Sequence, residues 1–161
     1  MDDLILKPVR RADVRPLIEL SVAPRQRGFV APNEITLAEA PYETGCHPFG
    51  LWRGARLVGF CALIDHREHA YLDPGDDPDA VFVWRLMIGA GDQGRGCGTA
   101  ALDRIGRWAR ARGRGGLLAT VRHDNRAARR FFARRGFVPT GRTWDGEVEI
   151  RHRFAGAPEP D

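Results

Sequence analysis

Lysine is almost absent from this chain of 161 residues, although basic residues are common. Of the 25 basic residues only Lys7 is a lysine, and the other 24 are arginines. A run of about 18 apolar residues is missing as well, so the sequence predicts no membrane-spanning helix and no membrane partner. The acidic start, residues 1–4, lacks the pattern of a signal peptide. We therefore expect a cytoplasmic protein.

Cysteine and tyrosine are also scarce. The three cysteines, Cys46, Cys61 and Cys97, are odd in number and lack the spacing of a metal site, so we expect no metal. Cys61 and Cys97 stand in apolar or glycine-rich surroundings, which favours buried positions over disulfides. Repeats and linkers are absent. The length and a hydrophobic share of 43% predict one globular domain, residues 1–154, followed by a flexible Gly/Pro-rich tail, residues 155–161.

The net charge of +4 owes much to arginines that gather in two segments. These are Arg104, Arg107, Arg110, Arg112 and Arg114, then Arg126, Arg129, Arg130, Arg134 and Arg135. Solvated helix faces are the simpler interpretation, and an electropositive rim for a polyanionic cofactor is the alternative. Because no aromatic interleaving or known motif accompanies the arginines, we expect no nucleic-acid partner.

Hydrophobic periodicity predicts seven strands and four helices in the order β-α-α-β-β-β-α-β-α-β-β. The expected strands cover residues 4–9, 48–52, 57–64, 81–88, 116–121, 137–140 and 147–154. The expected helices cover residues 13–22, 36–42 and 99–112, with a fourth that begins after Asp124 or Asn125 and stops at Gly136. Thr36 and Glu39 have the spacing of a capping box, and Trp144-Asp145-Gly146 predicts a turn between the last two strands.

The most informative motif is Gln93-Gly94-Arg95-Gly96-Cys97-Gly98, which joins the apolar segment 81–88 to the helix expected over 99–112. Glycines allow positive φ and let the backbone come close to a ligand. The first N–H groups of a helix lack partners and carry the positive end of its dipole. A strand, a glycine turn and a helix start therefore predict a site for a phosphate or pyrophosphate.

Two common phosphate loops do not fit this motif. A P-loop needs a lysine before its Ser or Thr, and Cys97-Gly98-Thr99 supplies none. A dinucleotide fingerprint has a different glycine spacing and comes early in its domain. The remaining pattern is Gln-x-x-Gly-x-Gly after an apolar strand, with a second strand–helix unit that ends in Phe132-Ala133-Arg134-Arg135-Gly136-Phe137.

In this pattern the chain resembles the GCN5-related N-acetyltransferase (GNAT) superfamily. The segments 83–88, 29–33, 37–40, 57–60 and 145–147 are similar to its bacterial spermine/spermidine (diamine) acetyltransferase branch. The resemblance implies an α/β GNAT fold, a mixed and mostly antiparallel sheet flanked by helices, with the cofactor between two splayed parallel strands. It implies acetyl-CoA as cosubstrate, bound by Leu86, Met87, Ile88, Gln93, Gly94, Arg95, Gly96, Cys97, Gly98, Thr99 and Asn125. Homodimers are common in this superfamily and are one expectation.

The residues that would complete the chemistry are harder to find. Many relatives carry a tyrosine as general acid seven residues after the asparagine, but here that position is Phe132, which has no proton to give. The central strand carries Trp84 and Arg85 in place of a catalytic carboxylate. The candidate bases are Glu34, Asp65, His66, His123, Glu147 and Glu149. Among these Glu34 is preferred because it follows Asn33 in the matched acceptor-side segment, and Trp84 is assigned either to the acceptor pocket or to the core.

The resulting prediction is an N-acetyltransferase that moves an acetyl group from acetyl-CoA to a primary amine by direct attack. A polyamine such as spermidine or spermine is the leading acceptor. The acidic loop 73–79 is either a solvated turn, the simpler interpretation, or a feature that attracts the polyamine. The alternatives are an aminoglycoside-like antibiotic, an amino-acid or protein amine, or an acyl-CoA-binding protein with little catalysis.

Overall fold

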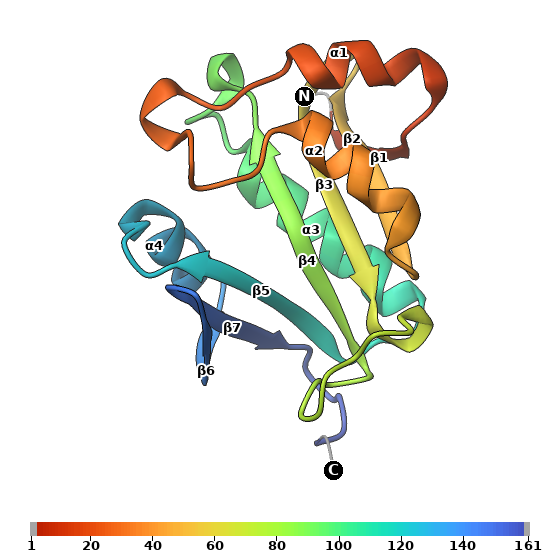
Figure 1. Cartoon of the computed structure of the whole chain (residues 1–161), viewed down its shortest axis with the longest axis vertical. Coiled ribbons are helices and arrows are strands. Elements are labelled where there is room, and N and C mark those ends of the chain that lie inside the picture. The colour runs from red at the N-terminus through yellow and green to blue at the C-terminus, as the bar shows by residue number, and fades with distance from the viewer. Residues whose placement is uncertain (1–2, 160–161) are drawn as a thin grey trace.

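A computed structural model describes residues 3–159, and a seven-stranded mixed sheet forms its centre (Figure 1). The strand order is β1-β2-β3-β4-β5-β7-β6. The strands are β1 Leu4–Pro8, β2 Cys46–Arg53, β3 Arg56–Asp65, β4 Ala80–Ile88, β5 Gly116–Arg122, β6 Val138–Trp144 and β7 Glu147–Arg153. The helices are α1 Val14–Glu19, α2 Asn33–Glu39, α3 Cys97–Ala111 and α4 Arg126–Arg134. The α/β fold and the order of strands and helices are therefore confirmed.

The only parallel pair among the named strands, β4 and β5, is joined at one end and open at the other. Its paired residues are Ala80 with Gly116, Val81 with Leu117, and Phe82 with Leu118. Beyond these residues β4 stays paired with β3 and β5 stays paired with β7, so the two strands diverge and form a V in Figure 1. This confirms the predicted splayed pair and leaves a gap in the middle of the sheet.

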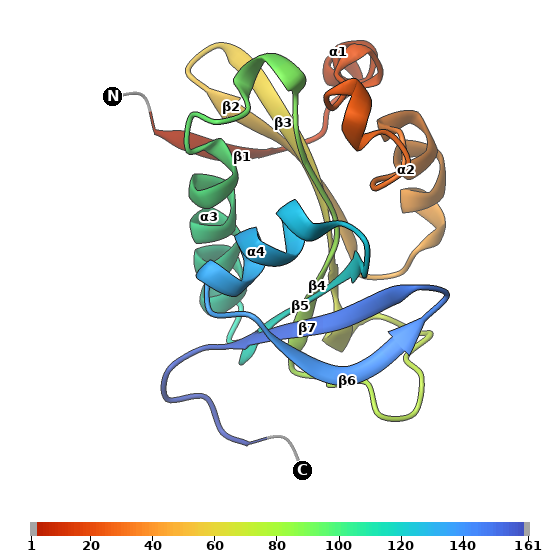
Figure 2. The same cartoon turned by 90° about the vertical axis from the view of Figure 1, so that its left-hand side faces the viewer.

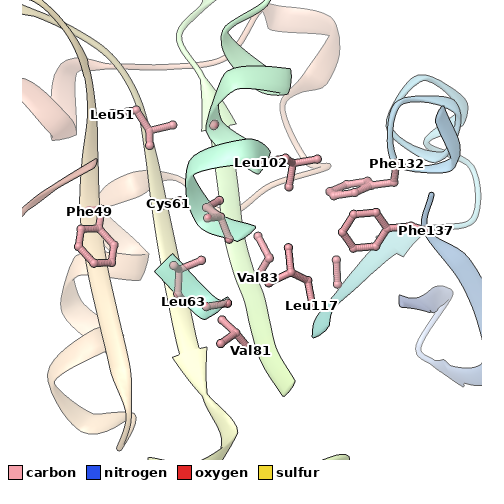
Figure 3. Packing of buried hydrophobic residues seen from close by; sticks show 14 of the residues in the cluster. Phe49, Leu51, Cys61, Leu63, Val81, Val83, Leu102, Leu117, Phe132 and Phe137 are labelled. Carbon is pink, nitrogen blue, oxygen red and sulfur yellow. The ribbon is translucent and has the colours of Figure 1, made fainter. Parts of the chain in front are cut away.

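Helices cover both faces of the sheet, with α3 and α4 on one side and α1 and α2 on the other (Figure 2). The larger core lies under α3 and α4 and includes Val81, Leu102 and Ile105. In this core the rings of Phe132 and Phe137 lie side by side, with centroids 5.0 Å apart (Figure 3). A smaller core of Leu17, Phe60, Ala62 and Met87 lies under α1 and α2.

A bulge interrupts β4 at Trp84. Val83 is opposite Leu63 and Arg85 is opposite Ala62, which leaves Trp84 as the extra residue. The alternation of side chains between the two faces of the sheet shifts by one residue there. Val83 and Leu86 both belong to the larger core, whereas Trp84 and Met87 belong to the smaller one. Because of the bulge, the consecutive side chains of Trp84 and Arg85 do not alternate regularly between the two faces of the sheet. The bulge lies just beyond Phe82, where β4 stops pairing with β5.

Several local predictions are confirmed. Asn125 caps α4, because its Oδ1 accepts a hydrogen bond of 3.2 Å from the Ala128 N–H. Gly136, beyond the end of α4, has φ +84°, which only glycine adopts readily. Asp145 and Gly146 have φ of +42° and +82° and connect β6 to β7, as expected for a type I′ hairpin turn.

The predicted cap at Thr36 is wrong. Helix α2 begins at Asn33, and Thr36 is buried inside it. The side chain of Asn33 donates to the carbonyls of Leu17 (2.9 Å) and Leu20 (3.2 Å), so it ties the start of α2 to the end of α1. That long-range anchor moves the helix start three residues earlier than the local pattern indicates. Helix α1 is also shorter than the predicted 13–22 and ends at Glu19.

The two chain ends lie partly outside the described residues. The expectations for residues 1–2 and for the last two residues of the tail, 160–161, fall there. Within the tail the Ala157 N–H donates to the carbonyl of Phe154, at 3.1 Å. Among residues 3–159 no helix is both long and apolar enough to pass through a bilayer.

Candidate active site

Two side chains anchor the start of the glycine motif, Asp92 just before it and Gln93 at its first position. Asp92, in the short 3₁₀ helix Ala90–Asp92, is buried and receives two hydrogen bonds from Arg56, of 2.9 and 3.0 Å. Gln93 Nε2 donates to the Ile88 carbonyl (3.0 Å) and to Gln26 Oε1 (2.6 Å). The Gln93 side chain therefore fixes the loop to the end of β4 and to the segment before α2.

The glycines that follow expose a set of backbone donors. Gly94 has φ +73° and Gly96, the N-cap of α3, has φ +79°. The first backbone bond of the helix is donated by Ala100 to the Gly96 carbonyl, and within residues 3–159 the N–H groups of 94–99 have no protein acceptor. No atom lies within 4 Å of where a Cβ on either glycine would stand. Free donors at the start of a 15-residue helix are suited to bind an anion.

Three further positions complete the loop, Thr99, Arg95 and Cys97. Arg135, beyond the end of α4, donates to the Thr99 hydroxyl, which can still donate its own proton to a ligand. The side chain of Arg95 is exposed. Cys97 is buried, as expected, and so is Cys61.

A single cleft of about 1630 Å³ connects this loop to the gap between β4 and β5. It brings together all but one of the predicted cofactor residues: Leu86, Met87, Ile88, Gln93, Gly94, Gly96, Cys97, Gly98, Thr99 and Asn125, with Arg95 outside. Asn125 uses its Oδ1 to cap α4, which leaves the Nδ2 donor for a ligand. Residues far apart in sequence therefore line one cleft together with the glycine loop.

The lining of the cleft also carries several acidic side chains. Its walls include Glu34 in the first turn of α2, Asp76 in the acidic loop, and Glu147 and Glu149 on β7. Trp84 lines the cleft and also packs against the smaller core. Asp76 and Glu149 pair with Arg142 (2.8 and 3.7 Å), so Glu34 and Glu147 are the carboxylates placed to attract a cationic acceptor.

The candidate bases fall into two groups, those that line the cleft and those that lie outside it. Asp65 and His123 lie outside the cleft lining, and Asp65 is fully buried in ion pairs with Arg112 (2.9 Å) and Arg114 (2.7 Å). Glu34, Glu147, Glu149 and His66 all line the cleft.

His66 has a defined tautomer in its neutral form. Its Nδ1 lies 2.8 Å from the Asp77 carbonyl, which can only accept a hydrogen bond, so Nδ1 carries the proton and Nε2 keeps a lone pair. The ring lies against Phe82, the last residue of β4 that pairs with β5. An imidazole lone pair thus lies where the sheet opens.

Phe132 is a packing residue, as predicted. It is buried against Phe131 and Phe137 in the larger core. Of the two tyrosines, Tyr71 lines the cleft but is largely exposed, and Tyr42 is exposed outside it.

Arg85 is a functional candidate that the sequence patterns did not single out. The residue lines the cleft from the middle of the central strand. An arginine within the apolar run 81–88 was the available signal. Within residues 3–159 no group of three or more His, Cys, Asp and Glu side chains could hold a metal ion.

Comparisons with known proteins agree with this geometry. Residues 14–137 match the sequence model of the Acetyltransferase (GNAT) family. The L-2,4-diaminobutyric acid acetyltransferase of Nocardia farcinica (strain IFM 10152) is 37% identical over 78 residues, which are 48% of this chain and 36% of that protein. The chain thus matches little more than a third of the length of that curated relative.

Solved structures share the fold. An acetyltransferase from Thermus thermophilus has a TM-score of 0.73 and 22% identity, over 94% of this chain and 97% of that one. The aminoglycoside acetyltransferase AAC(6')-Ib in complex with coenzyme A has a TM-score of 0.76 and 13% identity, over 94% of this chain and 95% of that one. At these identities the likeness concerns the fold.

Proposed function

Because the chain belongs to the GNAT acetyltransferase family, we propose that it transfers an acetyl group from acetyl-CoA to a primary amine of a small molecule with more than one amine. The observation that carries this proposal is the single cleft, which joins unpaired N–H groups at the start of α3 to carboxylates on α2 and β7. The N–H groups suit a pyrophosphate and the carboxylates suit a cation.

In the donor half, the N–H groups of residues 94–99 would hold the pyrophosphate, and the pantetheine arm would run beside Leu86, Met87 and Ile88. A backbone N–H of this strand would polarise the thioester carbonyl, and such a donor typically contributes roughly 3 kcal/mol to lowering the barrier. The thiolate leaves without help from a tyrosine, which is tolerable because thiols have pKa values near 8.5. Cys97 lies in the pyrophosphate loop, so we propose direct attack by the amine without an acyl-enzyme.

In the acceptor half, the carboxylates of the cleft favour polycationic amines such as spermidine. The name of the distant Nocardia relative points to a diamino acid, and AAC(6')-Ib has been solved with paromomycin and acetyl-CoA. Spermidine, a diamino acid and paromomycin all carry several amines, so an aminoglycoside is the second candidate acceptor. The decisive assay is steady-state thiol release from acetyl-CoA with spermidine, putrescine, L-2,4-diaminobutyrate and kanamycin. CoA binding without thiol release for any amine would instead identify an acyl-CoA-binding protein.

His66 and Glu34 are the two proposed bases, because an alkylamine must lose a proton before it attacks. We expect His66→Gln to lower kcat about a hundredfold, a typical general-base contribution. Glu34, exposed at the start of α2, suits attraction of the cation.

His123→Gln is the matched control, since its Nδ1 also lies 2.9 Å from a carbonyl, that of Gly146, but outside the cleft. A wild-type kcat for His66→Gln would exclude His66 as the base and leave Glu34→Gln as the next variant.

A further inference from the structure

Arg85 is a half-buried cation on the acceptor side of the cleft. Its side chain is 21% exposed and leaves β4 directly after the bulge at Trp84. The guanidinium lies over the Trp84 ring, with Cζ 4.3 Å from the ring centroid. Stacking on an aromatic ring restricts an arginine and sets the direction of its donors.

Most of these donors lack a protein acceptor. A guanidinium has five N–H groups, and within residues 3–159 only Nη1 makes a hydrogen bond, to the Trp84 carbonyl at 3.1 Å. Glu39 Oε2 lies 3.6 Å from Nη2, which is an ion pair but too long for a hydrogen bond. Nε is shielded from solvent and has no acceptor. Buried donors without partners are costly. The Nε atoms of Arg53, Arg135 and Arg151 are also unpartnered within residues 3–159, but of these four arginines only Arg85 lines the cleft, where a ligand with acceptor oxygens could reach its donors.

The charge of Arg85 is also incompletely balanced. Burial lowers the pKa of Arg85, and the carboxylates of Glu39 and Glu147 oppose that shift. Glu39 is exposed to solvent, whereas Glu147 lines the cleft with Arg85. The acceptor end therefore presents a cation and an anion to the same ligand.

We infer that the acceptor carries a carboxylate beside its amines, and that Arg85 binds this carboxylate. The inference rests on the proposed function and narrows its substrate class to small diamino acids. Paired oxygens of a carboxylate match the forked donors of a guanidinium, while Glu147 is placed to bind an ammonium group of the same molecule. A polyamine offers Arg85 no acceptor and brings a second positive charge toward it.

Diamino acids and the diamines formed by removing their carboxyl group provide the test. The pairs are L-ornithine with putrescine and L-2,4-diaminobutyrate with 1,3-diaminopropane, compared by kcat/KM. We expect the carboxylated member to be preferred by about tenfold to a hundredfold, as for a hydrogen bond to a charged group. Arg85→Gln should remove this preference, mainly through KM of the diamino acid, and Arg85→Lys should keep part of it.

Arg122→Gln is the matched control, because Arg122 also lines the cleft but is paired with Asp124 at the surface. It should change both members of a pair by the same factor. Equal kcat/KM within each pair for the wild type, or a preference that survives in Arg85→Gln, would overturn the inference while acetyl transfer itself still stands.

Binding measurements separate this inference from the proposed function. Calorimetric titration of the CoA-loaded protein with ornithine and with putrescine needs no turnover. Tighter binding of ornithine that Arg85→Gln abolishes supports the inference even if no amine is acetylated, a result that would defeat the proposed function alone. Unchanged CoA affinity and melting temperature in Arg85→Gln serve as the check that the variant is folded.

Discussion

Replacement of Gly96 by leucine is expected to abolish CoA binding. Gly96 is the N-cap of α3 with φ +79°, it lines the cleft, and no atom lies within 4 Å of where its Cβ would stand. A leucine there would occupy the place of the bound anion and distort the loop. Loss of two hydrogen bonds to a charged group, each worth about 1.5–3 kcal/mol, weakens binding at least a hundredfold. Isothermal titration with CoA measures this effect.

Gly113→Leu is the control that separates the loss of CoA binding from the loss of stability caused by a side chain at positive φ. Gly113 follows the opposite end of α3, has φ +73°, and likewise has no atom within 4 Å of its Cβ position. Both variants should therefore lose about 1–2 kcal/mol of stability from the left-handed backbone. Only Gly96→Leu should lose CoA. Wild-type affinity in that variant would mean that the pyrophosphate site lies elsewhere.

Asp65→Asn is expected to lower the free energy of unfolding by about 3–5 kcal/mol, the usual result when one partner of a buried ion pair is removed. The carboxylate is fully buried and receives hydrogen bonds from Arg114 Nε and Nη2 (2.7 and 2.9 Å) and from Arg112 Nε (2.9 Å). Asparagine keeps the shape but leaves the buried Arg114 without its counter-charge. Urea unfolding at pH 7 measures the difference.

The matched variant is Asp124→Asn. Asp124 also pairs with an arginine, Arg122, at 3.3 Å, but both side chains are exposed. Such surface pairs contribute about 0–1 kcal/mol. A small effect of Asp65→Asn, comparable to that of Asp124→Asn, would show that the buried pair contributes little.

The stabilising effect of Asp65 should also depend on pH. Burial raises the pKa of Asp65, but hydrogen bonds from Arg114 and Arg112 outweigh burial, so the pKa lies below its ordinary value of 3.8. A carboxyl whose pKa is lowered by folding contributes its full stability above the unfolded pKa and loses it as the pH falls through the folded pKa. The difference between wild type and Asp65→Asn should thus be constant near neutral pH and shrink below about pH 4.

Features fixed by a few neighbouring residues were predictable from the sequence. The positive φ of Gly94 and Gly96, the cap at Asn125 and the turn at Asp145-Gly146 each depend on residues within one turn of chain. The same is true of the strand–turn–helix order that identifies the anion loop. Thr36 shows the limit, because its local pattern lost to the contacts of Asn33 with α1.

Features that depend on distant partners were not predictable. The sequence places Asp65 among possible bases and Arg112 and Arg114 among solvated helix arginines, yet the fold joins them across 47 and 49 positions. Gln93 meets Gln26 across 67 positions. The bulge at Trp84, which directs Arg85 into the cleft, follows from pairing with β3 and has no counterpart in the alternation of β4 itself.

The divergence of β4 and β5 affects how readily the protein aggregates. A sheet of this kind exposes two outer edges, here β1 and β6, but the opening beyond Phe82 and Leu118 adds two inner ones. Unpaired edges present ready templates for strands of other chains, which is a route to aggregation. A pantetheine arm bonded along β4 would cover one of these inner edges. Acetyl-CoA would then protect the protein against self-association as well as supply the acetyl group.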